Sequence, residues 1–161
     1  MFRLVKVGLM GAAALWAITS ALYNITNWGE TLTYVEAVTS MSLIEGGADS
    51  WKATSNPAIV WLGALFIFLS KVAAAVLCSI GTWRMWQARS GGAEAFAAAK
   101  QLGLAGCGIA VIMLFGGFIA IAENFFDLWR AADAGDAILS AAYRYGGVMA
   151  LIGIFVGATD D

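Results

Sequence analysis

The sequence predicts an all-α fold, a four-helix transmembrane bundle, and three observations lead to this prediction. Hydrophobic residues make up 61% of the 161-residue chain and charged residues only 12%, whereas soluble domains average ~45–50% and ~25%. Uncharged runs recur that are long enough to cross roughly 30 Å of hydrocarbon at 1.5 Å per residue. The runs are continuously apolar, unlike the alternating strands of a transmembrane β-barrel. Lipid is therefore the expected solvent of most of the chain.

The first span is predicted at residues 7–25, after the basic residues Arg3 and Lys6. Such a start could belong to a signal peptide, but its apolar run is too long for that, so we interpret it as a retained span. Asn24, with Ile25 and Thr26, matches a glycosylation sequon. Because it adjoins the span, we interpret it as a cap at the helix end.

Three further spans are predicted at residues 58–82, 102–122 and 138–157. The first of these contains Lys71 near its middle, at a cost of roughly 2.5–3.5 kcal/mol on insertion scales. The many Leu, Ile, Val and Phe residues around it outweigh that cost. The whole chain, residues 1–161, is thus expected to be a single integral membrane domain.

The loop at residues 26–57, between the first two spans, is predicted to be structured, because connections of such length rarely lack structure in compact domains. Apolar residues recur in it at i, i+4 and i+7, which favours a short amphipathic helix lying on the bilayer or on the bundle. Its candidate docking residues are Trp28, Tyr34, Val38, Met41 and Trp51.

The distribution of Lys and Arg predicts the orientation of the spans. Lys52, Arg130 and Arg144 lie on one side, and the larger group of cations lies on the other, which is expected to be cytoplasmic. Both termini are then cytoplasmic. The cations of the larger group are Arg3, Lys6, Arg84, Arg89 and Lys100.

Composition argues against several classes of function. The net charge is −2 and no basic stripe exists, so nucleic acid is not expected as a partner. The chain contains no His, the commonest metal ligand and general base. Cys78 and Cys107 lie in apolar runs without the spacing of a zinc site or a disulfide framework. We expect no cofactor and no metal.

Lys71 is the most informative residue, because an ionisable side chain within a span usually faces a bundle interior, a cavity or a partner. Its helical face carries many small residues, which suits packing against another helix. No partner is expected at matching depth in the other three spans. Three interpretations stay open: Lys71 snorkels or is neutral, it meets a carboxylate, carbonyl or lipid phosphate of another molecule, or it serves a proton or ion path.

An outer charged rim is predicted after the third span. Glu123, Asp127 and Arg130 are spaced i, i+4 and i+7, which places them on one helical face. Such a rim could hold a hard cation or receive a basic partner. The simpler interpretation is that these charges solvate a helix end, with Arg144 as a counter-ion.

Four segments resemble the bacterial family of predicted small integral membrane proteins that is classified as a domain of unknown function, family number 2165. The resemblance covers nearly the whole chain and implies a four-span bundle without a known activity. The segments are Asn24-Ile25-Thr26-Asn27-Trp28, Val38-Thr39-Ser40-Met41, Trp51-Lys52-Ala53, and Gly81-Thr82-Trp83-Arg84-Met85-Trp86.

The chain departs from the pattern of this family at several polar positions. Members tend to have His near Ala37, an acid near Ser42, another His near the start of the second span, and Glu in place of Lys71. This chain therefore lacks most of the polar groups of a small-molecule or metal site, which favours a packing role.

The predicted function is that of a non-catalytic accessory or structural subunit, packed against a larger membrane complex of the respiratory or photosynthetic electron-transfer type. The bacterial inner membrane is the expected location. The alternative is a small transporter or channel component with Lys71 in the ion or proton path. An enzyme is not expected, because no nucleophile and base can be paired from these residues.

Overall fold

The structure is a computed structural model that describes residues 2–159, and within this range it contains helices and no strands. Four of its helices are long and apolar enough to cross a membrane, so the predicted all-α bundle is confirmed. Each predicted span lies within one of them. These helices are α1 (Phe2–Thr26), α3 (Pro57–Ala88), the continuous pair α4 (Ala93–Val111) and η2 (Ile112–Phe125), and α5 (Ala132–Gly157).

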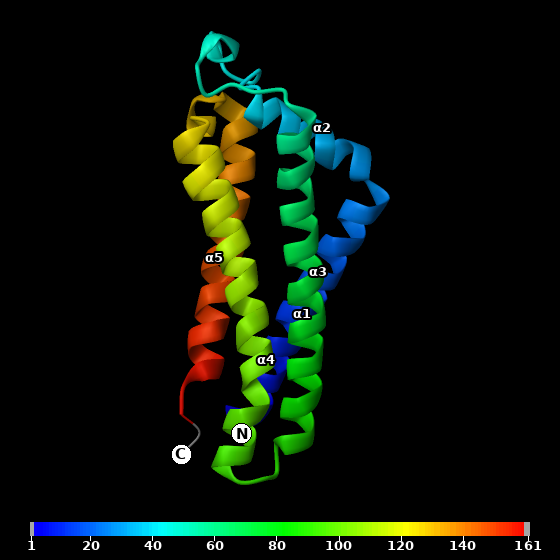
Figure 1. The fold of residues 1–161 in the computed structure, drawn as a ribbon. Helices are drawn as coiled ribbons and strands as arrows, with labels where there is room; N and C mark the ends of the chain where they lie inside the picture. The colour runs from blue at the N-terminus through cyan, green and yellow to red at the C-terminus, as the bar shows by residue number, and fades with distance from the viewer. Residues whose placement is uncertain (1, 160–161) are drawn as a thin grey trace.

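The four long helices run alternately up and down (Figure 1). We call the end where α1 begins and α5 finishes the terminal end, and the opposite end the loop end. The loop end carries α2 (Trp28–Thr39), the irregular segment 40–56 with η1 (Gly47–Asp49), and η3 (Leu128–Arg130). Going round the bundle, α1 packs on α3, α3 on α4, α4 on α5, and α5 on α1.

The start of α3 follows directly from its sequence. The side-chain oxygen of Asn56 accepts a hydrogen bond from the backbone N–H of Ala58 at 2.9 Å, which satisfies one of the free donors of the first turn. Pro57 occupies the first helical position, where its missing N–H costs nothing. A stretch of 32 residues then continues without interruption to the terminal end.

The third long helix changes its winding along its length. It is α-helical to Val111 and π-helical from Ile112 to Phe125. The hydrogen bonding of a π-helix, from an N–H to the carbonyl five residues earlier, continues past Phe125. The N–H of Phe126 donates to the carbonyl of Ile121 at 3.0 Å. A π-helix has a different angular step from an α-helix, so side chains after Ile112 leave the faces that a period of 3.6 predicts.

The terminal half of the bundle is packed through small and sulfur-containing side chains. Gly81 of α3 lies directly against the backbone of Gly103 in α4: a Cβ atom on Gly81 would lie 2.5 Å from the Gly103 Cα. The side chain of Met10 in α1 also packs against Gly103, where a Cβ atom would lie 2.7 Å from the Met10 sulfur. Cys78 and Cys107 are buried in the same cluster. Close backbone approach of this kind is the usual way to gain packing between spans in lipid.

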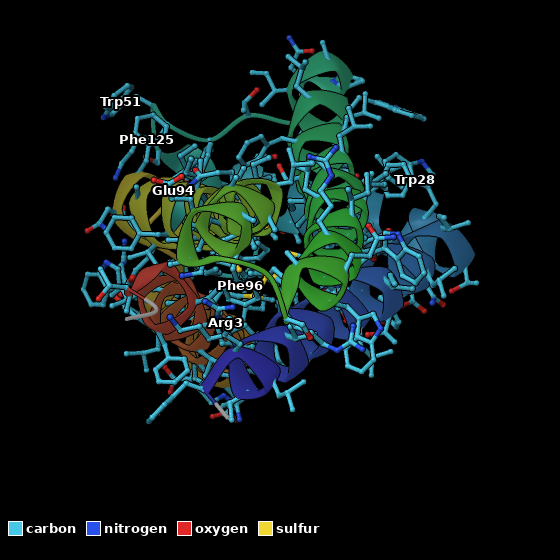
Figure 2. The ribbon with its side chains drawn as sticks, turned by 90° about the horizontal axis from the view of Figure 1, so that it is seen from below. Arg3, Trp28, Trp51, Glu94, Phe96 and Phe125 are labelled. Carbon is cyan, nitrogen blue, oxygen red and sulfur yellow. The ribbon has the colours of Figure 1, made fainter. Side chains whose placement is uncertain are left out.

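Three cations hold the terminal end together. Lys6 of α1 and Lys100 of α4 are each 3% exposed, and their Nζ atoms donate to the carbonyl of Ala158, just after α5, at 2.6 and 2.8 Å. Arg3 donates to the carbonyl of Gly91 at 2.6 Å and lies 5.1 Å from the centre of the Phe96 ring (Figure 2). Helix α5 therefore ends on carbonyls that cations from two other helices satisfy.

Replacing Lys100 with methionine is expected to lower the free energy of unfolding by about 1 kcal/mol, because a charge-assisted bond to the end of α5 is lost while Lys6 keeps its own. Hydrogen exchange in the last turn of α5 should become faster. Arg84→Met, which removes an exposed cation from the terminal end of α3, serves as the control. Equal exchange in the two variants would show that Lys100 does not cap α5.

Candidate functional site

A cavity of about 300 Å³ lies in the loop half of the bundle. Its walls come from the last turns of α1, from α2, from the first half of α3, from η2 and from the start of α5. Towards the loop end α1 tilts away from α4 and α5 (Figure 1), and its last turns line the cavity. The walls are predominantly apolar, as in most small-molecule sites, and the polar side chains come chiefly from α1, α2 and Lys71 of α3.

Helix α2 forms one wall because it packs alongside α3 rather than beyond its end. Val35 rests on Gly63 of α3, where a Cβ atom would lie 2.9 Å from the Val35 side chain. The Trp28 ring packs at a tilt against Trp61 and edge-to-face against Phe68, with ring centroids 5.6 and 5.8 Å away. The predicted short helix therefore exists, and in this structure it lies on the bundle.

A chain of hydrogen-bonded polar side chains lies at the inner end of the cavity. This end is marked by Lys71, the cavity residue that lies farthest along α3 from the loop end. The Nζ of Lys71 donates to Oδ1 of Asn24 at 2.5 Å. The Nδ2 of Asn24 donates to the hydroxyl of Thr31 at 2.8 Å, and that hydroxyl donates to the carbonyl of Asn27 at 3.3 Å. Asn24 is only 4% exposed. This chain joins α1, α2 and α3 through side chains that would be costly to bury without partners.

Two sequence predictions about these residues are wrong. Lys71 does have a partner in another span, and Asn24 is not a helix cap, since α1 continues to Thr26. The sequence prediction compared depth by helical rise alone, which takes no account of where α1 ends relative to α3. At 1.5 Å per residue, Lys71 lies about 21 Å along α3 from Pro57, which brings it level with the end of α1. Asn24 could have been found because it is the one amide side chain within the four predicted spans.

The π-helical segment forms the wall facing α3. Gly117, Phe118, Ile121 and Ala122 all line the cavity. A Cβ atom on Gly117 would lie 3.2 Å from the Phe66 ring, whereas Gly116 has nothing within 4 Å. π-Helical turns occur often at functional sites. The π-helical winding of this wall therefore supports the choice of the cavity as the candidate site.

The outer charged rim is not arranged as predicted. The helix ends at Phe125, and Asp127 adopts a left-handed backbone conformation (φ 54°) before η3. Glu123, Asp127 and Arg130 therefore do not share a helical face. Asp127 instead forms an ion pair with Lys52 of the irregular segment, at 2.7 Å. The period of 3.6 failed here because π-helical winding and a turn replace the expected α-helix.

The remaining rim residues have other partners. Glu123 accepts a hydrogen bond from the Tyr143 hydroxyl at 3.1 Å, and Arg144 donates from Nε to the carbonyl of Ser140 at 3.2 Å. Arg130 is exposed in η3. The structure thus ties η2 to α5 through Glu123 and Tyr143, and the four charges do not converge on one point.

The candidate docking residues of the loop are divided between core, cavity and surface. Met41 is 1% exposed and lies in the core of the loop half, so it cannot form a docking surface. Val38 and Tyr34 line the cavity. Trp51 is 85% exposed and stands over Phe125, with ring centroids 6.1 Å apart (Figure 2).

Within residues 2–159, no three side chains of His, Cys, Asp or Glu gather closely enough to hold a metal ion. The cavity offers instead one ammonium, one amide, and hydroxyls of Thr and Tyr at the edge of an apolar space. Such an arrangement can bind and orient an apolar molecule through one polar group.

A family profile described as "predicted small integral membrane protein (DUF2165)" matches residues 2–159. The chain belongs to this family. Searches of curated proteins and of solved structures gave no match. The resemblance predicted from four sequence segments is confirmed, and this DUF2165 member is a small integral membrane protein with several apolar helices.

Proposed function

We propose that this DUF2165 member is a non-catalytic membrane protein that binds an apolar membrane molecule in the cavity of its loop half. The observation that carries the proposal is the cavity itself: about 300 Å³ of mainly apolar space with polar side chains at its inner end. Small-molecule sites have volumes of about 300–1,000 Å³ and combine apolar walls with few polar groups in the same way.

The position of the cavity favours a ligand that enters from the bilayer. Several lining residues are also exposed on the outside of the bundle: Tyr23 of α1, Tyr34 of α2 and Ile121 of η2 are 55%, 60% and 52% exposed. Because these side chains of α1, α2 and η2 both line the cavity and are exposed, this region of the cavity is open to the surroundings of the bundle. An apolar molecule dissolved in lipid can reach this region without crossing water.

Two adjacent glycines provide a matched test. Gly117→Leu places a side chain in the cavity, and Gly116→Leu adds the same side chain where nothing lies within 4 Å. Native mass spectrometry of the delipidated protein in maltoside detergent measures the binding of 1-dodecanol. We expect one bound molecule per chain, at least about tenfold weaker binding for Gly117→Leu, and no change for Gly116→Leu. Absence of binding, or equal binding by both variants, would overturn the proposal.

A second candidate function is that of an accessory or structural subunit of a larger membrane complex, of the respiratory or photosynthetic electron-transfer type, in the bacterial inner membrane with both termini cytoplasmic. Its support is Trp51, a large side chain that is 85% exposed on a segment tied down by the ion pair between Lys52 and Asp127. Exposed aromatic residues on ordered segments are enriched at interfaces.

Purification from the native membrane in mild detergent separates the two functions. Stoichiometric co-migration with a large complex, lost in Trp51→Ala, supports the subunit function. A species that migrates alone with a bound amphiphile supports the first proposal. Trp129→Ala is the control, because Trp129 is a similarly exposed residue of η3, 61% exposed.

A further inference from the structure

Lys71 lines the cavity, and no negatively charged side chain of the described residues pairs with it. Among residues 2–159 its one hydrogen-bond partner is Asn24, and no carboxylate lies within ion-pair distance of its Nζ. An ammonium has three donors, and Oδ1 of Asn24 accepts only one of them. The side chain is half-buried among apolar walls, where an uncompensated charge is costly.

The acidic residues adjacent in sequence to cavity residues are Glu30, Glu36, Glu123 and Asp127, and within residues 2–159 no ion pair joins any of them to Lys71. Glu30 accepts a hydrogen bond from the Tyr23 hydroxyl at 3.1 Å, and Glu123 accepts one from Tyr143. Neither forms an ion pair with Lys71. The negative charge that would complement Lys71 is therefore absent from the described part of the chain, and a ligand can supply it.

We infer that the cavity binds a single-chain amphiphile with a carboxylate head group, such as a fatty acid, and that Lys71 is the residue that binds the carboxylate. The inference rests on the proposed function and adds the chemical class of the ligand. Asn24 acts as a positioning residue: Thr31 fixes its amide, and its Oδ1 holds the Lys71 ammonium at the inner end of the cavity.

The size and depth of the site favour one acyl chain over a phospholipid. A volume of about 300 Å³ is at the lower limit for ligand sites. Lys71 lies about 21 Å along α3 from Pro57, so a phosphodiester head group with two chains would have to be drawn far from the membrane surface. A carboxylate is smaller, and its chain can follow the apolar walls towards Tyr23 and Ile121.

The test compares dodecanoic acid with 1-dodecanol, which has the same chain length and no charge. Native mass spectrometry of the full chain in maltoside detergent gives the affinity of each for the wild type, Lys71→Met and Lys71→Arg. We expect the acid to bind the wild type about ten- to a hundredfold more tightly than the alcohol, as for a charge-assisted hydrogen bond. Lys71→Met should abolish this preference, and Lys71→Arg should retain most of it.

The possible outcomes distinguish the inference from the proposed function. Equal binding of acid and alcohol by the wild type would overturn the carboxylate inference and leave the cavity as a site for neutral molecules. A preference that survives in Lys71→Met would also overturn it. Failure of both compounds to bind would overturn the inference and the proposed function together. Unchanged helical circular dichroism of each variant confirms that loss of binding does not come from unfolding.

Discussion

Gly81→Ala is expected to destabilise the bundle by about 1–3 kcal/mol, although alanine is the better helix former. The new Cβ atom would lie 2.5 Å from the backbone of Gly103, and backbone cannot rotate out of the way as a side chain does. Helices α3 and α4 must then move apart, which is the situation in which overpacking is costly. Reversible unfolding of the protein in mixed detergent micelles, followed by circular dichroism, gives the change in free energy.

Gly108→Ala is the matched control in α4, since a Cβ atom at Gly108 meets nothing within 4 Å. This variant should be neutral or more stable by up to about 1 kcal/mol, because alanine replaces glycine within a helix. The two substitutions add the same atom and are expected to change stability in opposite directions. Stabilisation by both would show that α3 and α4 do not approach as closely as the structure indicates.

Asn24→Ala is expected to cost about 1.5–3 kcal/mol, because the Lys71 ammonium then loses its one acceptor among the described residues. The same substitution should cost much less in the Lys71→Met background, where no charge needs that acceptor. A double-mutant cycle on these two positions measures the coupling free energy through detergent unfolding. Coupling of at least about 1 kcal/mol is expected for such a contact.

Asn27→Ala provides the comparison for this cycle. Asn27 is less buried than Asn24 and lies at the turn between α1 and α2, where its side chain donates to the Tyr23 carbonyl at 3.1 Å. Its loss should be nearly additive with Lys71→Met. If Asn24→Ala proves equally additive, Lys71 and Asn24 are not energetically linked.

The sequence was sufficient to predict the spans because hydrophobicity over about 20 residues is a strong signal. Lys71 did not obscure the second span, since the surrounding apolar residues outweigh one charge. The end of the second span was less predictable, because α3 extends to Ala88, beyond the apolar run at 58–82. Helical structure continues past the hydrocarbon-length segment wherever the backbone bonds remain favourable.

The candidate site was only half visible in the sequence. Lys71 attracted attention because a charge in a span is rare, but its partner depends on how α1 tilts, which is decided by packing and not by composition. Asn24 therefore looked like a cap. Met41 matched an amphipathic pattern, yet the helix ends at Thr39, and Met41 itself has a left-handed backbone conformation (φ 54°) and lies in the core.

The rim charges show a different limit. The spacing of Glu123, Asp127 and Arg130 indicates one face only if the helix is α-helical and continuous. The residues around Ile112 do not predict that the winding changes there, and the turn at Asp127 is shown by its left-handed backbone conformation. Periodicity is reliable for the presence of a helix and less so for the direction of each side chain.

The unequal spacing of the helices makes the two halves of the molecule mechanically different. At Gly81 and Gly103 the backbones of α3 and α4 leave no room for a Cβ atom, so this contact should be nearly incompressible. The half with the cavity holds about 300 Å³ of removable space, and hydrostatic pressure favours states in which such space is eliminated. Under pressure the bundle should therefore deform first between α1 and η2, while the glycine contact between α3 and α4 keeps its geometry.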